Sequence, residues 1–216
     1  GALQPGSLEV VTRGAVFAGA GRERALCLRA LADVGALREG WHELDDELGA
    51  LLWLARSDDD AEAAEAAAAA WGLYTQCAEA AGEVPEGGPA AYVPARLEPN
   101  LLPLLGDGAS RVREQTARAL AAAAAAEPER IPSLLQKLFE LYKSRVPPPP
   151  SAKGGRAAPP PPMEGEEEEE EDWRSRLGVA LGLGALAPSL RAREQLPVVF
   201  AFMKNALGDA HEAVAQ

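Results

Sequence analysis

The sequence is poor in the residues that form β-sheets. It has one isoleucine, Ile131, and aromatic residues make up 5% of its 216 residues, whereas alanine and leucine supply most of the 47% that are hydrophobic. Strands favour β-branched and aromatic residues, and helices favour alanine and leucine. This scarcity excludes a β-sandwich, a β-barrel and most sheets large enough for an α/β enzyme.

Residues that bind metals or form disulfides are also few. Cys27 and Cys77 lie in helical patterns outside any CxxC pair, and we interpret them as small buried side chains in a reducing compartment. His42 and His211 are far apart, and the HExxH motif that His42 could begin has Asp46 in place of its second histidine. The sequence contains no phosphate-binding loop or nucleophile elbow. We therefore predict that the protein is not an enzyme and uses no cofactor, metal or small-molecule substrate.

Membrane and export signals are missing as well. No apolar run is long enough to span a membrane, and no secretory signal opens the chain. These features predict a cytoplasmic protein with no membrane partner. Because the first residue is Gly1 and Gln216 stops inside an apparent helix, we expect a fragment of a longer chain.

The charge of the chain is concentrated in one place. The net charge of -12 disfavours a nucleic-acid-binding surface spread over the whole chain. The segment Glu164–Asp172, however, holds eight acids interrupted by one glycine, and the remaining acids nearly balance the bases. The acidity is therefore mainly local.

The acidic run belongs to a low-complexity segment over residues 146–172. Proline runs, glycines and glutamates in this segment cannot bury enough apolar surface to offset the entropy of ordering, so we predict a disordered insert with order resuming near Trp173. The predicted organisation is a solenoid over 1–145, the insert, and a continued solenoid over 173–216. The acidic run is either a solvated loop or an arm that contacts a basic partner or repels nucleic acid locally.

Apolar residues elsewhere recur at helical spacing. Ser57, Ser110 and Ser133 are the expected N-caps of three helices. The expected helices cover residues 7–17, 22–34, 43–55, 61–80, 97–105, 110–126, 134–145, 174–187 and 193–207. They form antiparallel pairs over 7–38, 43–80, 97–126, 131–187 and 193 onward. Helix pairs of this length that cannot bury their own apolar faces predict an all-α fold, an α-solenoid.

The pairs share a register that resembles the HEAT repeat. Asp107 stands in a turn with Val112-Arg113 at the start of the following helix, and Asp209 is followed at the same spacing by Val214. In HEAT proteins the turn aspartate and the arginine of neighbouring repeats hydrogen-bond along the stack. Of these two turns, only the first has both members, since Ala215 replaces the arginine after Asp209. The resemblance implies structural roles for Asp107, Val112, Arg113 and Asp209.

Four stretches in order resemble a more specific family, the giant HEAT-repeat general-control non-derepressible translational activators. These stretches are Leu8–Arg13, Leu104–Gln115, Leu138–Tyr142 and Trp173–His211. Members of this family dock on ribosomes, partner an ATP-binding-cassette protein and activate the kinase of the α subunit of translation initiation factor 2. The resemblance implies a non-catalytic scaffold whose partners are ribosomal protein and rRNA, with the other two partners bound through the full-length protein.

An arginine cluster supplies the candidate ribosome contacts, which are Arg111, Arg113, Arg118, Arg174 and Arg176. Two alternatives stay open. One is another HEAT or TOG-type adaptor, for example one that binds tubulin or acts in transport, although the turn 106–109 offers neither the tryptophan nor the basic residues of a TOG surface. The other is an enzyme of unknown type, for which the sequence shows no polar constellation.

Overall fold

A computed structural model of the chain describes residues 5–36, 46–82, 97–146, 165–190, 195–209 and 214. Every regular element in these ranges is helical, and no strand occurs among them. The first two pairs are α1 (Pro5–Phe17) with α2 (Gly21–Ala36), and α3 (Asp46–Ala55) with α4 (Ala61–Ala80). The predicted all-α fold is confirmed.

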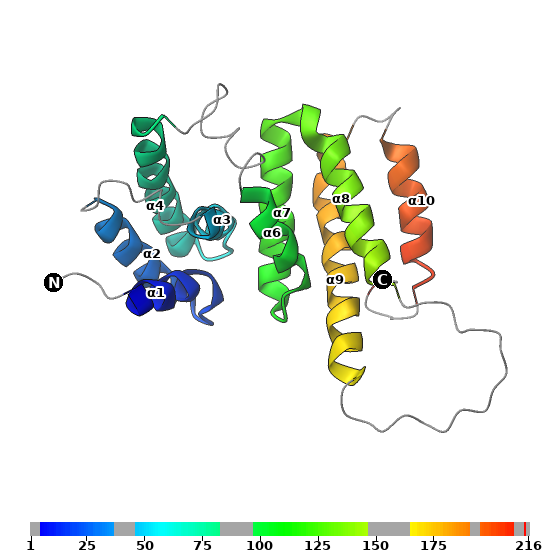
Figure 1. Cartoon of the computed structure of the whole chain (residues 1–216), viewed down its shortest axis with the longest axis horizontal. Coiled ribbons are helices and arrows are strands. Elements are labelled where there is room, and N and C mark those ends of the chain that lie inside the picture. The colour runs from blue at the N-terminus through cyan, green and yellow to red at the C-terminus, as the bar shows by residue number, and fades with distance from the viewer. Residues whose placement is uncertain are drawn as a thin grey trace.

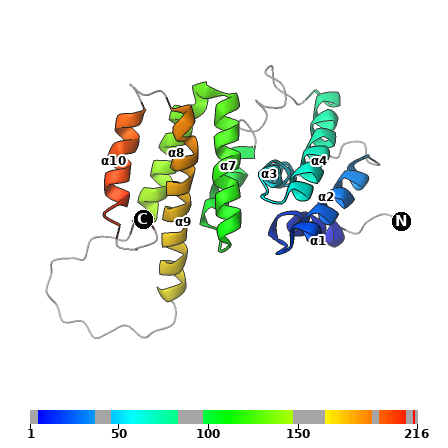
Figure 2. The same ribbon diagram turned by 180° about the vertical axis from the view of Figure 1, so that it is seen from behind.

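The remaining helices continue the pairing. α6 (Glu98–Leu101) runs into the 3₁₀ helix η3 (Leu102–Gly106) and is followed by α7 (Ser110–Ala126). A 3₁₀ turn, η4 (Pro128–Arg130), leads into α8 (Ile131–Ser144), whose partner is α9 (Gly165–Leu186). The turn η5 (Ala187–Ser189) and α10 (Leu196–Ala206) follow. Figures 1 and 2 show the helices in a row from α1 and α2 at one end to α10 at the other.

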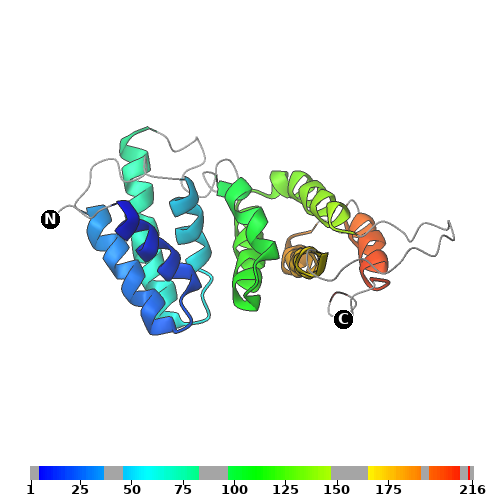
Figure 3. The same cartoon turned by 60° about the horizontal axis from the view of Figure 1, so that its bottom comes forward.

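Second helices of successive pairs pack on one another in two places. α2 packs extensively on α4, and α7 packs extensively on α9. Figure 3 shows α9 end-on, between α7, α8 and α10. Each helix thereby buries its apolar face against a neighbour, as the pattern of an α-solenoid requires.

Leucine, alanine and a few aromatic side chains form the core. Leu28, Leu31 and Leu54 are fully buried in the first two pairs. Trp53 and Trp71 meet edge-on with ring centroids 5.3 Å apart, and Trp71 stacks on Tyr74 at 5.5 Å. The many alanines of α4 and α7 let these helices approach their neighbours closely with few large side chains.

The expected N-caps are wrong. The cap of α4 is Asp60, whose carboxylate accepts the backbone N–H of Ala63 at 3.0 Å, and not Ser57. Ser110 is the first residue of α7, which has no side-chain cap. Ser133 lies inside α8, because the proline at position 132 fits the first turn of a helix and allows an earlier start at Ile131.

The acidic segment is helical at its C-terminal end, where the sequence predicts disorder. α9 begins at Gly165, eight residues before Trp173, so the last part of the 146–172 segment is helical. Glutamate is a good helix former, and negative charge is favourable near a helix N-terminus, which explains the longer helix. Residues 147–164 lie outside the described residues, and their expected disorder stays a prediction.

Candidate functional site

A buried ion pair joins the first helical pair to the turn of the second. Nε and Nη2 of Arg24 in α2 each donate to the carboxylate of Asp58 at 2.7 Å, and Nη1 donates to the carbonyls of Ala18 and Gly19 at 3.0 Å. The side chains of Arg24 and Asp58 are 4% and 1% exposed. Gly21 permits this approach, because a Cβ at that position would lie 2.1 Å from the carboxylate of Asp60.

The ionised form of Asp58 is favoured in this setting. Burial raises the pKa of the carboxyl, but the hydrogen bonds from Arg24 and from the backbone N–H of Asp60 outweigh burial and hold the pKa below its ordinary value. The pair is therefore charged at neutral pH, and the low dielectric of its surroundings strengthens the attraction.

An equivalent pair joins the fourth helical pair to the turn that follows α10. Arg176 in α9 donates to both carboxylate oxygens of Asp209 at 2.8 and 3.0 Å and to the carbonyl of Arg145 at 2.7 Å. The Tyr142 hydroxyl donates to the same carboxylate at 2.9 Å. Burial, and then the bond to Asp209, raise the pKa of Tyr142 to about 12.

These two pairs are rungs of one ladder. In each, an arginine of the second helix of one pair bonds an aspartate in the turn of the next pair. The turn aspartates also organise their own turns: Asp58 accepts the N–H of Asp60 at 2.9 Å, and Asp107 accepts the N–H of Ala109 at 2.8 Å. We refer to Arg24–Asp58 and Arg176–Asp209 as the rungs.

α4, the second helix of the second pair, contains no arginine that could reach Asp107. Six residues after Asp107 stands Arg113, and six residues after Asp58 stands Ala64. Arg113 is buried and donates to the backbone carbonyls of Asp107 and Gly108 at 2.6 and 3.1 Å. The expected partnership of Arg113 with Asp107 is therefore made through the backbone carbonyl.

The sequence also predicts structural roles for Val112 and Asp209. Val112 is fully buried, and the carboxylate of Asp209 accepts a hydrogen bond from Arg176. Sequence reasoning missed Arg24 and Asp58 as a rung. Arg24 stands six residues after Ala18 in the turn of the first pair, just as Arg113 stands six residues after Asp107. Because Asp58 occupies in the second pair the position of Ala18 in the first, this spacing could have identified Arg24 and Asp58.

The five candidate arginines do not share one environment. Arg113 and Arg176 are buried, and their guanidinium groups bond inside the protein. Burial, followed by the positive charge of Arg174, lowers the pKa of Arg113. Arg174 is half-exposed beside Trp173, 5.7 Å from its ring centroid.

Arg111 and Arg118 in α7 reach back to the first two pairs. Arg111 donates to the carbonyls of Val16 and Ala18, and its guanidinium lies 3.7 Å from the Asp58 carboxylate. Arg118 pairs with Asp59, and these two side chains are 44% and 58% exposed. These residues connect the third pair to the turns of the first and second.

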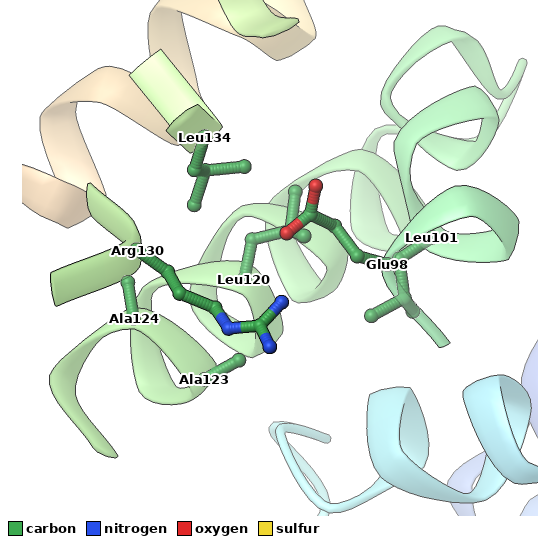
Figure 4. Close-up of a pocket in the computed structure, with 7 residues that line it drawn as sticks. All are labelled: Glu98, Leu101, Leu120, Ala123, Ala124, Arg130 and Leu134. Atoms are coloured by element: carbon green, nitrogen blue, oxygen red, sulfur yellow. The ribbon is translucent and has the colours of Figure 1, made fainter. Parts of the chain in front are cut away.

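A small pocket lies between α6, α7 and α8. Its walls are Leu101, Leu120, Ala123, Ala124 and Leu134, with Glu98 and Arg130 at its edge (Figure 4). Its free volume of about 10 Å³ is room for no more than a water molecule. Glu98 pairs with Lys137, and Arg130 pairs with Glu127 at 2.7 Å, so both charges are bound within the protein.

The described ranges offer no other chemical site. They contain no group of three or more histidine, cysteine or acidic side chains placed to hold a metal ion. None of the helices in those ranges is long and apolar enough to cross a membrane. The distinctive feature of this region is the ladder of charged side chains along the helix turns.

Comparison with protein families identifies this architecture. The family described as "Stalled ribosome sensor GCN1, HEAT repeats" matches residues 42–216, from just before α3 to the last residue. Comparison with curated proteins and with solved structures gave no match. The match covers well over half of the chain and confirms the resemblance found from the residues alone. The chain therefore belongs to the stalled ribosome sensor GCN1 family and is built from its HEAT repeats.

Proposed function

We propose that the chain is a ribosome-binding part of a non-catalytic scaffold that acts in the cytoplasm. The observation that carries this proposal is the family match over residues 42–216. In the proposed mechanism, the full-length protein docks on a stalled ribosome and promotes activation of the initiation-factor-2 α kinase during amino-acid starvation. The ATP-binding-cassette partner and the kinase bind through the full-length protein.

A solenoid suits such a role because its extended surface can touch distant sites at once. The rungs support this proposal physically. They tie the first pair to the turn of the second and the fourth pair to the turn after α10, so that surfaces across these two joints keep their spacing.

Within the proposed interface, the arginines divide by environment. Arg113 and Arg176 are buried and brace the stack. Arg118 is exposed and Arg174 half-exposed, so these two are the proposed contacts with rRNA phosphates or acidic ribosomal protein. Arg111 bonds two carbonyls within the protein and has a bracing role in this proposal.

Ribosome pelleting tests the proposal. The parent chain is expected to sediment with purified ribosomes and to dissociate as salt rises, because phosphate contacts release counterions. Arg174→Glu and Arg118→Glu should each weaken binding. Arg29→Glu is the matched control, since Arg29 is an exposed helical arginine paired with Glu62. Failure of the parent chain to pellet, or equal loss in the control, would contradict the proposed contacts.

The proposed insert is tested in the same assay. Deleting residues 147–164 removes the segment that we propose to be disordered and leaves α9 complete. If the segment is only a solvated connection, ribosome binding will be unchanged. If Glu164–Asp172 is an arm that contacts basic ribosomal proteins, replacing its glutamates with glutamine will weaken binding. Microtubules serve as the comparison partner, and binding to them instead of ribosomes would favour a TOG-type adaptor.

A further inference from the structure

The joints between successive pairs are built differently. α2 packs on α4, and α7 packs on α9. α9 also lies so close to η3 that a Cβ on Gly178 would lie 1.9 Å from the carbonyl oxygen of Leu105. α4, by contrast, makes no more than marginal contact with α7. Figures 1 and 2 both show α3 standing between α4 and α7. The row of second helices is therefore open at the joint between the second and third pairs.

One short helix supplies the apolar contact across this joint. α3 is buried along its length from Leu48 to Ala55 and packs against α6 and α7. The indole N–H of Trp53 donates to the carbonyl of Ala119 in α7 at 3.0 Å. A joint held by one central helix, with the helices beside it unpacked, can rotate about that helix.

Charged side chains span the open joint at the turn end of α4. Arg118 of α7 pairs with the exposed Asp59, and Arg111 of α7 donates to carbonyls at the end of α1. Among the residues that the structure describes, no rung reinforces this joint: Ala64 stands six residues after Asp58, whereas Arg24 stands six residues after Ala18. The angle between the first two pairs and the pairs that follow them is thus restrained mainly by polar contacts.

We propose that the joint between the second and third pairs is the point at which this solenoid bends, with α3 as the pivot and Arg118–Asp59 and Arg111 as an electrostatic latch. This inference goes beyond the proposed function, because it concerns the shape of the chain and does not depend on ribosome binding. Exposed charges are screened by salt: the Debye length falls from about 10 Å at 0.1 M to about 3 Å at 1 M. The bend is therefore sensitive to ionic strength.

Distances between spin labels measure the bend. Labels at Gln76→Cys in α4 and Ala122→Cys in α7, both exposed positions, report the joint directly in a chain carrying Cys27→Ala and Cys77→Ala. The distance distribution is expected to broaden and shift to longer values as salt rises, and to do the same in Arg118→Gln at low salt. Labels at Ala30→Cys in α2 and Gln76→Cys are expected to give a narrow distribution that salt does not change.

Matched variants separate the latch from general charge effects. Arg29→Gln removes an exposed ion pair with Glu62 across the well-packed α2–α4 joint and should leave both distributions unchanged. The exchange Asp59→Arg with Arg118→Asp should restore the narrow distribution. The proposal is overturned if the α4–α7 distribution is as narrow as the α2–α4 one and responds to neither salt nor Arg118→Gln. If circular dichroism shows that Arg118→Gln unfolds, the salt series on the parent chain decides alone.

Discussion

At the scale of single residues, the rungs are charged groups placed where water cannot solvate them. Arg176 and Asp209 have side chains that are 6% and 5% exposed, and they satisfy each other through two hydrogen bonds. A buried pair of this kind adds little compared with apolar packing, yet removing one partner leaves an uncompensated charge. The rungs therefore make the register between repeats hard to change.

This asymmetry predicts a large effect from a small substitution. Asp209→Asn is expected to lower the free energy of unfolding by about 3–5 kcal/mol, because Arg176 then stays charged and buried. Glu62→Gln, which removes an exposed pair with Arg29, should cost about 0–1 kcal/mol. Urea denaturation followed by circular dichroism measures both. If the two variants lose similarly small amounts of unfolding free energy, Arg176 is not left as an uncompensated buried charge and the prediction is wrong.

Tyr142 predicts a change of stability at alkaline pH. Its pKa is raised from an ordinary value of about 10 to about 12, so the folded protein holds this proton more tightly than the unfolded chain does. The contribution, about 3 kcal/mol, is complete below pH 10 and is lost as the pH rises toward 12.

The measurement compares urea midpoints of the parent chain and of Tyr142→Phe between pH 8 and pH 11. The phenylalanine variant has no hydroxyl to titrate at this position, so its stability should fall less with pH than that of the parent. The gap between the two proteins is expected to narrow above pH 10. A gap that stays constant would contradict the raised pKa.

The sequence predicts individual structural residues only where an aspartate marks the turn of a helical pair. Asp107 and Asp209 stand in glycine-containing turns that reveal the repeat; Asp107 accepts the N–H of Ala109, and Asp209 accepts a hydrogen bond from Arg176. Arg24 was missed because its own turn carries Ala18 instead of an aspartate. The burial of Arg113 and Arg176 depends on neighbouring helices and could not be seen in local spacing.

At the scale of whole elements, α9 shows how glycine sets the distance between helices. Gly178 faces the carbonyl of Leu105 in η3, and Gly106 of η3 faces the side chain of Ser175. Glycine inside a helix lowers its stability, so its presence at a helix contact is explained by the close approach it permits.

Two glycines of α9 therefore predict opposite effects. Gly178→Ala would place a methyl group against backbone that cannot rotate away, and is expected to cost about 1–3 kcal/mol. Gly184→Ala places the same group where no atom lies within 4 Å, and is expected to stabilise the protein by about 0.5–1 kcal/mol. Thermal unfolding of the two variants provides the test. A destabilising Gly184→Ala, or a neutral Gly178→Ala, would count against this packing.

Prediction at the element scale succeeded for helix positions and failed for several helix ends. The apolar stripe of α3 and the alanine-rich pattern of α4 are long enough to determine helices. Ends depend on competition between nearby caps: Asp60 caps α4 although Ser57 stands three residues earlier. Low complexity predicts disorder up to Trp173, but α9 already begins at Gly165, because glutamates continue a helix readily.

At the scale of the whole molecule, α10 at one end of the row carries an exposed apolar surface beside its buried face. Val199, Phe202 and Ala206 form the buried face of α10, and the ring of Phe202 lies 4.5 Å from that of Tyr142. Phe200 and Met203 of the same helix, and Leu207 directly after its end, are 62%, 48% and 66% exposed at helical spacing. A contiguous apolar stripe of this kind marks a contact surface or a site of self-association.

The exposed stripe predicts that the chain self-associates as its concentration rises. The exposed side chains of the stripe should contribute little to the free energy of unfolding. The double variant Phe200→Glu with Leu207→Glu should sediment as a monomer over a range of concentrations, with its free energy of unfolding within about 0.5 kcal/mol of the parent, because both positions are exposed. Phe202→Ala is the matched control on the buried face. It should lose about 3–5 kcal/mol of stability while the folded fraction still associates. Sedimentation velocity measures self-association, and urea denaturation measures stability. The two variants should affect them separately, because Phe200 and Leu207 face solvent whereas Phe202 faces α8. A parent chain that stays monomeric, or a double variant that associates as strongly as the parent, would exclude the stripe as the contact surface.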